Sequence, residues 1–127
     1  MTDNAASLAG LSLLLVEDNR DIADLTALSL GVLGAEVVCA YNGKQALSQA
    51  DTRAFDALVI DLGLPDMDGR VVAKTLRGRD YGARLIGLSG FDLDLDEEDQ
   101  RLFDAYLQKP CGAPDIAQAL AASGEET

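Results

Sequence analysis

Residues 56–69 read DALVIDLGLPDMDG, and the place where their apolar run stops decides the fold. The apolar residues 57–60 are followed at once by the carboxylate of Asp61, and then by a turn that contains Gly and Pro. A short, almost wholly apolar run bounded by turn residues is typical of a strand covered on both faces of a sheet. We therefore predict a buried strand at residues 57–61 that presents an acid at its carboxyl end.

Similar short apolar runs occur in the sequence before and after this strand. The run LSLLLV is also almost wholly apolar, whereas the run EVVCA is less so and suits the edge of a sheet. In this way four further strands are predicted, at residues 11–16, 36–40, 84–88 and 104–107.

The interval after the first strand has a helical pattern. Its apolar residues recur every three or four positions, as on the apolar face of an amphipathic helix. Asn19 is the expected cap of this helix, and Gly34 is its expected end. The recurring residues are Ile22, Leu25, Leu28 and Val32.

Three further helices are predicted in the later intervals. One opens at Asp68-Gly69 and is expected to bury three apolar side chains, and Pro114 suits the first turn of the last helix. These helices are predicted at residues 44–50, 69–77 and 114–122, and the three side chains are Val71, Val72 and Leu76.

The segment before the fifth strand departs from this regularity. Residues 92–99, DLDLDEED, contain four Asp and two Glu. Repulsion between these charges and poor apolar patterning oppose a long helix. We therefore expect the fourth helix to be short or irregular.

The alternation of strands with helical segments predicts an α/β domain. Its sheet should be parallel, with helices on both faces and right-handed crossovers. A chain of 127 residues suits one domain. We place it at residues 11–122, between a flexible lead-in at 1–10 and a frayed tail at 123–127.

The composition excludes several classes of function. With 10 Lys and Arg against 22 Asp and Glu, the net charge is −12, so the surface repels nucleic-acid phosphates. The absence of histidine excludes a Ser-His-Asp triad and His-ligated zinc. Cys39 and Cys111 have no metal-ligand spacing and are expected to be reduced thiols. Without a signal peptide or an apolar stretch that could span a membrane, a cytoplasmic protein with no membrane contact is expected.

Polar side chains follow the predicted strands at the point where each strand ends. They are Glu17 and Asp18 after the first strand, Asp61 at the third, Ser89 after the fourth and Lys109 after the fifth. In an open parallel sheet, ligands bind beyond the carboxyl ends of the strands. We therefore predict that three acids, a hydroxyl and a lysine form one site at that edge.

Three carboxylates in one place need a compensating charge. Two carboxylates about 4 Å apart repel by roughly 4 kcal/mol at an effective dielectric constant near 20, so at least one of three should have a raised pKa. A divalent cation removes this cost, and Mg²⁺ suits a site of carboxylates, waters and a phosphate. A lysine can hold a phosphoryl oxygen, and aspartate is a known nucleophile toward phosphorus. The site is therefore predicted to accept a phosphoryl group on a carboxylate, with Mg²⁺ as the cofactor.

Four motifs in the chain lie at these strand ends, namely LLLVEDN (13–19), VIDLGLPDMDG (59–69), IGLSG (86–90) and YLQKP (106–110). In order and spacing they resemble the response-regulator receiver domains of two-component signalling, including those attached to hybrid histidine kinases. The resemblance covers about residues 11–122. It implies a flavodoxin-like, doubly wound sheet of five parallel strands in the order 2-1-3-4-5.

The resemblance also implies a role for each residue at the predicted site. Asp61 matches the phosphoacceptor, and Lys109 matches the lysine that binds the phosphoryl group. Asp18 matches the direct metal ligand, and Glu17 matches an acid that acts on the metal through water. Gly63 would contribute its backbone carbonyl to the metal.

Further residues match the switch and the surroundings of the site. Ser89 matches the hydroxyl that contacts the phosphoryl group and changes position. Tyr106 matches the aromatic residue whose ring turns inward when that hydroxyl moves. Gly90 leaves an approach path beside Ser89, and Phe91 flanks the site, where a bulky ring is expected to slow hydrolysis of the acyl phosphate.

The implied function is a phosphorylatable switch with its own phosphotransfer and autodephosphorylation activity. Its donor would be a histidine kinase or a histidine phosphotransfer protein, and its output a downstream protein target; the oligomeric state stays open. One alternative is a degenerate receiver that binds partners without phosphorylation. A Mg²⁺-dependent phosphohydrolase would need a second Asp where Gly63 stands, and a flavin module would place a phosphate against Glu17 and Asp18.

Overall fold

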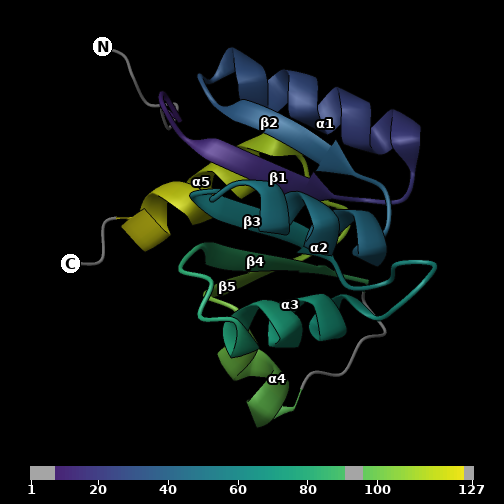
Figure 1. The fold of residues 1–127 in the computed structure, drawn as a ribbon. Helices are drawn as coiled ribbons and strands as arrows, with labels where there is room; N and C mark the ends of the chain where they lie inside the picture. Colours follow the sequence, from purple (N-terminus) through teal and green to yellow (C-terminus); the bar gives the residue numbers. More distant parts are fainter. Residues whose placement is uncertain (1–7, 91–95, 125–127) are drawn as a thin grey trace.

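The structure is a computed structural model that describes residues 8–90 and 96–124. Five parallel strands form one sheet in the order β2-β1-β3-β4-β5 (Figure 1). This confirms the α/β fold that the sequence pattern predicted and the strand order that the resemblance implied. The strands are β1 (Ser12–Val16), β2 (Glu36–Ala40), β3 (Ala57–Asp61), β4 (Arg84–Ser89) and β5 (Ala105–Gln108).

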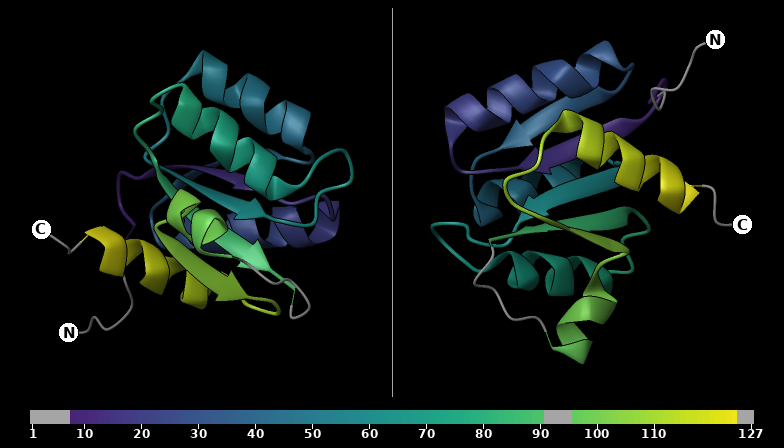
Figure 2. Two further views of the ribbon diagram at one scale, coloured as in Figure 1. Left: turned by 90° about the horizontal axis from the view of Figure 1, so that it is seen from below. Right: turned by 180° about the vertical axis from the view of Figure 1, so that it is seen from behind.

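Helices cover both faces of the sheet. Figure 2 shows α1 and α5 against one face and α2 and α3 against the other, with α4 beside α3. Each face has its own cluster of buried apolar side chains. The helices are α1 (Arg20–Val32), α2 (Gly43–Thr52), α3 (Gly69–Gly78), α4 (Glu97–Leu102) and α5 (Ala113–Gly124).

The central strand β3 is buried along its whole length, from Ala57 to Asp61. Its register with its neighbours aligns their carboxyl ends: Ile60 pairs with Val16 of β1, and Asp61 pairs with Leu88 of β4. Because all five strands run in parallel, the residues that follow them reach the same edge of the sheet.

Short polar residues start the helices, as predicted for Asn19 and Asp68. The side-chain oxygen of Asn19 accepts a hydrogen bond from the backbone N–H of Ile22 at 3.1 Å. The carboxylate of Asp68 accepts one from the backbone N–H of Arg70 at 2.8 Å. Such caps satisfy backbone donors that have no partner within the helix, so they fix where each helix begins after its loop.

The predicted helix α1 is present, but its apolar stripe faces the solvent rather than the sheet. The side that packs on the sheet carries Ala23 and Leu30, which are both fully buried. The periodicity therefore identified the helix but not its buried side. We call the exposed stripe the α1 face; its side chains are between 48% and 80% exposed, and they are Ile22, Leu25, Leu28 and Val32.

The predicted core contacts of α3 were correct at two of three positions. Val72 and Leu76 are fully buried, whereas Val71 is 46% exposed and lies on the outer side of the helix. Consecutive residues of a helix point about 100° apart, so Val71 and Val72 cannot both face the sheet fully.

Two leucines of α1 offer a direct test of which side of this helix faces the sheet. Leu30→Ala is expected to lower the free energy of unfolding by about 2–5 kcal/mol, because it leaves a cavity in the core. Leu28→Ala removes a side chain that is 68% exposed, and it should change stability by less than about 0.5 kcal/mol. Urea unfolding followed by circular dichroism measures both. Equal losses would contradict the orientation of α1.

The fourth helix is short, as the acidic composition of its segment predicted. It has six residues, Glu97–Leu102, and none of its side chains is buried. Asp96 caps it by accepting a hydrogen bond from the backbone N–H of Asp99 at 2.8 Å.

Within the part of the chain that the structure describes, no helix has both the length and the hydrophobicity needed to cross a membrane.

Candidate functional site

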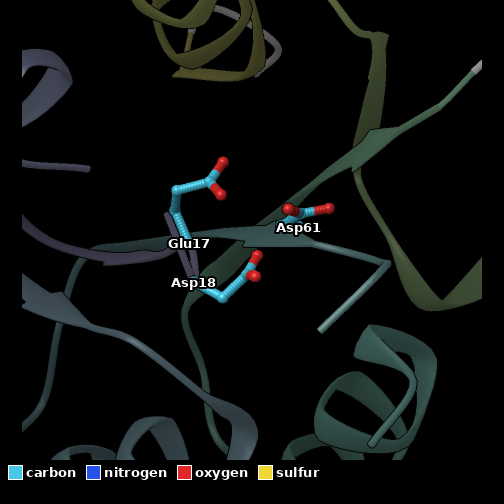
Figure 3. Close-up of side chains that lie close together, drawn as sticks. All are labelled: Glu17, Asp18 and Asp61. Carbon is cyan, nitrogen blue, oxygen red and sulfur yellow. The ribbon is translucent and has the colours of Figure 1, made fainter. Parts of the chain in front are cut away.

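The residues predicted at the strand ends do lie at one edge of the sheet. Glu17 and Asp18 follow β1, Asp61 ends β3, Ser89 ends β4 and Lys109 follows β5. In Figure 3 the three carboxylates gather around a common space at the ends of β1 and β3. The constellation is therefore produced by the parallel topology, which brings together residues as far apart in the sequence as 17 and 109.

The three acids are close enough to share one cation. Carboxylate oxygens of Glu17, Asp18 and Asp61 lie within 4.8 Å of one another. Glu17 and Asp61 are each only 4% exposed, whereas Asp18 is exposed to solvent. The cluster therefore has a buried side that fixes two of its acids and an open side through which an ion or a phosphoryl group can enter.

Both carboxylate oxygens of Asp61 are engaged. Oδ1 accepts a hydrogen bond from the backbone N–H of Gly63 at 3.0 Å. Oδ2 accepts one from the ammonium of Lys109, also at 3.0 Å. These contacts hold the carboxylate at the end of β3 in one orientation and so fix where its two oxygens lie.

Glu17 is held by two donors, one from its own loop after β1 and one from the residues that follow β5. Its Oε2 accepts a hydrogen bond from the backbone N–H of Asn19 at 3.1 Å, and its Oε1 lies 3.4 Å from the Lys109 ammonium. Burial raises the pKa of Glu17, and the nearby charge of Asp61 raises it further, against the hydrogen bond from Asn19. This agrees with the prediction that one of three clustered acids would have a raised pKa.

Lys109 is the cation that faces the two buried acids. Burial lowers the pKa of its ammonium, but the hydrogen bond and the charge of Asp61 outweigh burial, so its pKa is raised. Its backbone N–H donates to the Ser89 carbonyl at 2.8 Å, which ties the end of β5 to the end of β4. The lysine therefore stays charged and is fixed beside the acids.

The donor set fits a hard divalent cation such as Mg²⁺. All three acids offer oxygen, and ligand oxygens around Mg²⁺ lie roughly 3–4 Å apart because each sits about 2.1 Å from the ion. A spread of up to 4.8 Å therefore needs only small side-chain rotations to reach that geometry. The same ion would offset the repulsion that raises the pKa of Glu17.

The remaining predicted residues surround this cluster. Gly63 is exposed and follows Asp61 by two positions. Gly90 is exposed, and a Cβ built there would meet no atom of the described residues within 4 Å. Tyr106 lies on β5, partly buried against Phe103. Phe91 lies outside the described residues.

Two contacts near the site were not predicted from the sequence. Asn19 was expected to cap α1, but its backbone also orients Glu17. Asp66, which lies between β3 and α3, accepts hydrogen bonds from the backbone N–H groups of Gly43 and Lys44 at 2.8 and 3.0 Å. The adjacent Glu-Asp-Asn triplet was a signal for the first contact. The second had no local signal, because its partners lie 23 and 22 residues away.

Comparison with known families and proteins gives one consistent result. The family model described as the response regulator receiver domain matches residues 13–121. The chain is 34% identical over 122 residues to the sensor protein TorS of Escherichia coli (strain K12), a match that spans 94% of this chain and 13% of that protein. It is 38% identical over 105 residues to a response regulator receiver protein of Anaeromyxobacter sp. (strain Fw109-5), over 81% of this chain and 44% of that protein. The chain thus spans less than half the length of either relative.

Solved structures show the same likeness. The CheY-like receiver domain from Methylobacillus flagellatus superposes with a TM-score of 0.82 at 34% identity, covering 89% of this chain and 98% of that one. A sensor protein from Polaromonas sp. JS666 superposes with a TM-score of 0.81 at 28% identity, covering 90% of this chain and 95% of that one.

Proposed function

The chain belongs to the response regulator receiver domain family of two-component signalling, and from this premise we propose that it is a phosphorylatable switch whose acceptor is Asp61. One observation carries the proposal. The Asp61 carboxylate is fixed by Gly63 and Lys109 within 4.8 Å of the carboxylate oxygens of Glu17 and Asp18. This arrangement offers a nucleophile, a cation-binding cluster and a phosphoryl-binding lysine at one place.

The proposed transfer takes a phosphoryl group from a phosphohistidine of a kinase or phosphotransfer protein. A carboxylate oxygen of Asp61 attacks the phosphorus, and the new O–P bond forms as the P–N bond breaks. The electron pair of the broken bond stays on the imidazole nitrogen of the donor. In the later hydrolysis, water attacks the phosphorus and returns Asp61 as a carboxylate with release of inorganic phosphate.

The surrounding residues lower the cost of this transfer by positioning and by charge. Lys109, which contacts Asp61 Oδ2, and the Ser89 hydroxyl would hold phosphoryl oxygens. Mg²⁺ would be held by Asp18, Asp61 and the Gly63 carbonyl, with Glu17 acting through water. When bound, it supplies the positive charge that neutralises both the acids and the incoming phosphoryl group.

Phosphorylation would act as a switch by shifting a population of states. A phosphoryl group on Asp61 can favour only a conformation that it contacts differently from the unphosphorylated one. Ser89 would approach the phosphoryl group and Tyr106 would turn inward. This movement would change the surface formed by β4, β5 and α5, which a downstream protein recognises.

Intact-mass measurement after incubation with acetyl phosphate tests the proposal. The wild type is expected to gain one phosphoryl group in the presence of Mg²⁺ and none after chelation. Asp61→Asn keeps the size of the side chain but removes the nucleophile, so it should gain nothing under either condition. A wild type that gains nothing from acetyl phosphate or from a phosphohistidine protein would instead favour a receiver that acts without phosphorylation.

The exposed α1 face is the surface that we propose for a protein phosphodonor. The helix begins at Arg20, two residues after Asp18, so this face starts beside the site that the donor must reach. Its four apolar side chains are exposed, and contiguous exposed apolar side chains are typical of protein interaction sites.

A charge introduced into the α1 face should separate the protein donor from a small one. Leu28→Asp is expected to leave the rate with acetyl phosphate unchanged, because Leu28 is 68% exposed and lies on the outer side of α1. With a phosphohistidine protein that phosphorylates the wild type, the rate should fall by roughly tenfold or more. Lys74→Gln on α3, at an exposed position, also changes the net charge by −1 and is the control for charge. Equal rates with the protein donor would show that the α1 face is not the contact.

A further inference from the structure

Asp99, in the first turn of α4, joins two separate parts of the molecule. Its carboxylate accepts a hydrogen bond from the Arg70 guanidinium at 2.8 Å, and its backbone carbonyl accepts one from the Tyr106 hydroxyl at 2.8 Å. The Asp99 side chain is 13% exposed and that of Arg70 is 28% exposed. The ion pair is therefore largely shielded from water, and solvent weakens it less than an exposed pair.

Arg70 connects Asp99 to the loop that follows Asp61. Its guanidinium also donates to both carboxylate oxygens of Asp68, at 2.6 and 2.9 Å. Asp68 pairs with Gly63 through a β-bridge, and the N–H of Gly63 donates to Asp61. A continuous series of contacts thus runs from the proposed phosphoacceptor to the Asp99 carboxylate.

Polar contacts largely determine the position of the first turn of α4. The helix has six residues and no buried side chain, and its partly buried Leu102, which packs against the core, lies at the far end of the helix from this turn. Its last residue is held separately, where Arg77 Nε donates to the carbonyl of Leu102 at 3.1 Å. The backbone carbonyl of Asp99 accepts the hydrogen bond from the Tyr106 hydroxyl. The position of this carbonyl therefore depends strongly on the ion pair between Arg70 and Asp99.

We propose that the Arg70–Asp99 ion pair is a latch that keeps the Tyr106 hydroxyl on the Asp99 carbonyl in the unphosphorylated domain. Asp99 and Arg70 then act as positioning residues for the switch. The inference rests on the proposed function, since it takes Asp61 as the phosphoacceptor and Tyr106 as the residue that moves.

The latch has a consequence for the reaction at Asp61. If phosphorylation releases Tyr106 from Asp99, the two events are linked, and each changes the equilibrium of the other by the same factor. A variant without the ion pair loses a contact that only the unphosphorylated state makes. The population of the variant shifts toward the conformation that the phosphorylated domain adopts, and its phosphorylation becomes faster.

Asp99→Asn is the sharpest test because it keeps the backbone carbonyl and the size of the side chain but removes the charge. Two quantities are measured, the rate of phosphorylation by acetyl phosphate with Mg²⁺ and the ¹⁹F NMR spectrum of protein labelled with fluorotyrosine. The chain has three tyrosines, and Tyr106→Phe assigns the signal of interest. The variant should be phosphorylated roughly three to ten times faster than the wild type, the range expected for one shielded ion pair. Without phosphorylation, its Tyr106 signal should already lie toward the position found in the phosphorylated wild type.

Matched variants distinguish the latch from a general loss of stability. Arg79→Gln breaks the ion pair between Asp51 and Arg79, the residue that follows α3, whose partners lie 2.7 Å apart, and it should change neither quantity. Arg70→Gln should behave as Asp99→Asn does. In a Tyr106→Phe background, Asp99→Asn should no longer raise the rate, because the hydroxyl that the latch holds is absent.

Each outcome supports or overturns the inference. A Tyr106 signal and a rate equal to those of the wild type, or a slower rate, in both Asp99→Asn and Arg70→Gln would overturn it, provided that circular dichroism shows both variants folded. An equal rise in the Tyr106→Phe background would also overturn it. A wild type that is never phosphorylated would overturn the proposed function, and the inference with it.

Discussion

Lys109→Met is expected to change two properties of the site in opposite directions. The rate of phosphorylation should fall by roughly 100-fold or more, because the variant lacks a fixed cation where negative charge develops in the transition state. The affinity for Mg²⁺ should rise by roughly tenfold, because a positive charge no longer repels the ion. Lys109 lies 3.0 Å from Asp61 Oδ2 and 3.4 Å from Glu17 Oε1, so it shares both acids with the ion.

Opposite signs separate a phosphoryl-binding lysine from a merely structural one. A lysine that only stabilised the fold would lower both the rate and the affinity when it was lost, because the acids would no longer be held in place. Lys74→Met removes an equal charge from an exposed position on α3 and is the control for net charge. Isothermal titration calorimetry measures the affinity, and intact mass measures the rate. A parallel loss of both would contradict the assignment of Lys109.

The strands could be predicted well because their limits are marked locally. β2 and β3 have the predicted bounds, Glu36–Ala40 and Ala57–Asp61, since each apolar run stops at polar or turn residues. The predicted ends of helices that lack such marks were less accurate. The second helix runs to Thr52 rather than residue 50, and the last runs to Gly124 rather than residue 122.

The orientation of α1 could not be predicted from its pattern. Periodicity shows that a stripe of Leu, Ile and Val lies on one side of a helix, but it does not show which side meets the sheet. Here the sheet side is lined by Ala23 and Leu30, and the Cys39 thiol of β2 lies 3.8 Å from the Ala23 carbonyl oxygen. The exposed stripe is a departure from the usual rule, and such departures are expected where a protein binds another.

The candidate site was predicted from topology, whereas its surroundings were not. Strand ends in a parallel sheet must meet at one edge, so the proximity of Glu17, Asp61 and Lys109 followed once the strands were assigned. The ion pair of Arg70 with Asp99 depends on how α4 packs beside α3. No periodicity or local motif encodes that contact, because its partners lie 29 residues apart.

Gly69→Ala is expected to be among the most destabilising single substitutions at the site. Gly69 opens α3, and its N–H donates to the Leu62 carbonyl at 2.9 Å. A Cβ at this position would lie 2.6 Å from the carbonyl oxygen of Asp61 and 2.7 Å from the Cα of Leu62. Both are backbone atoms of the buried strand end, which cannot yield without moving the sheet. We expect a loss of about 2–3 kcal/mol in the free energy of unfolding.

Gly78, at the other end of the same helix, is the matched control. A Cβ there would meet nothing within 4 Å, so Gly78→Ala should keep or raise stability, by up to about 1 kcal/mol, through higher helix propensity. Thermal and urea unfolding compare the two variants. Because the strained contact at Gly69 includes the backbone of Asp61, phosphorylation of Gly69→Ala by acetyl phosphate should also slow, while that of Gly78→Ala should not. If the two variants were equally stable, α3 could not lie as close to the end of β3 as the structure places it, and the support that this packing gives to the acceptor would have to come from Gly63 and Lys109 alone.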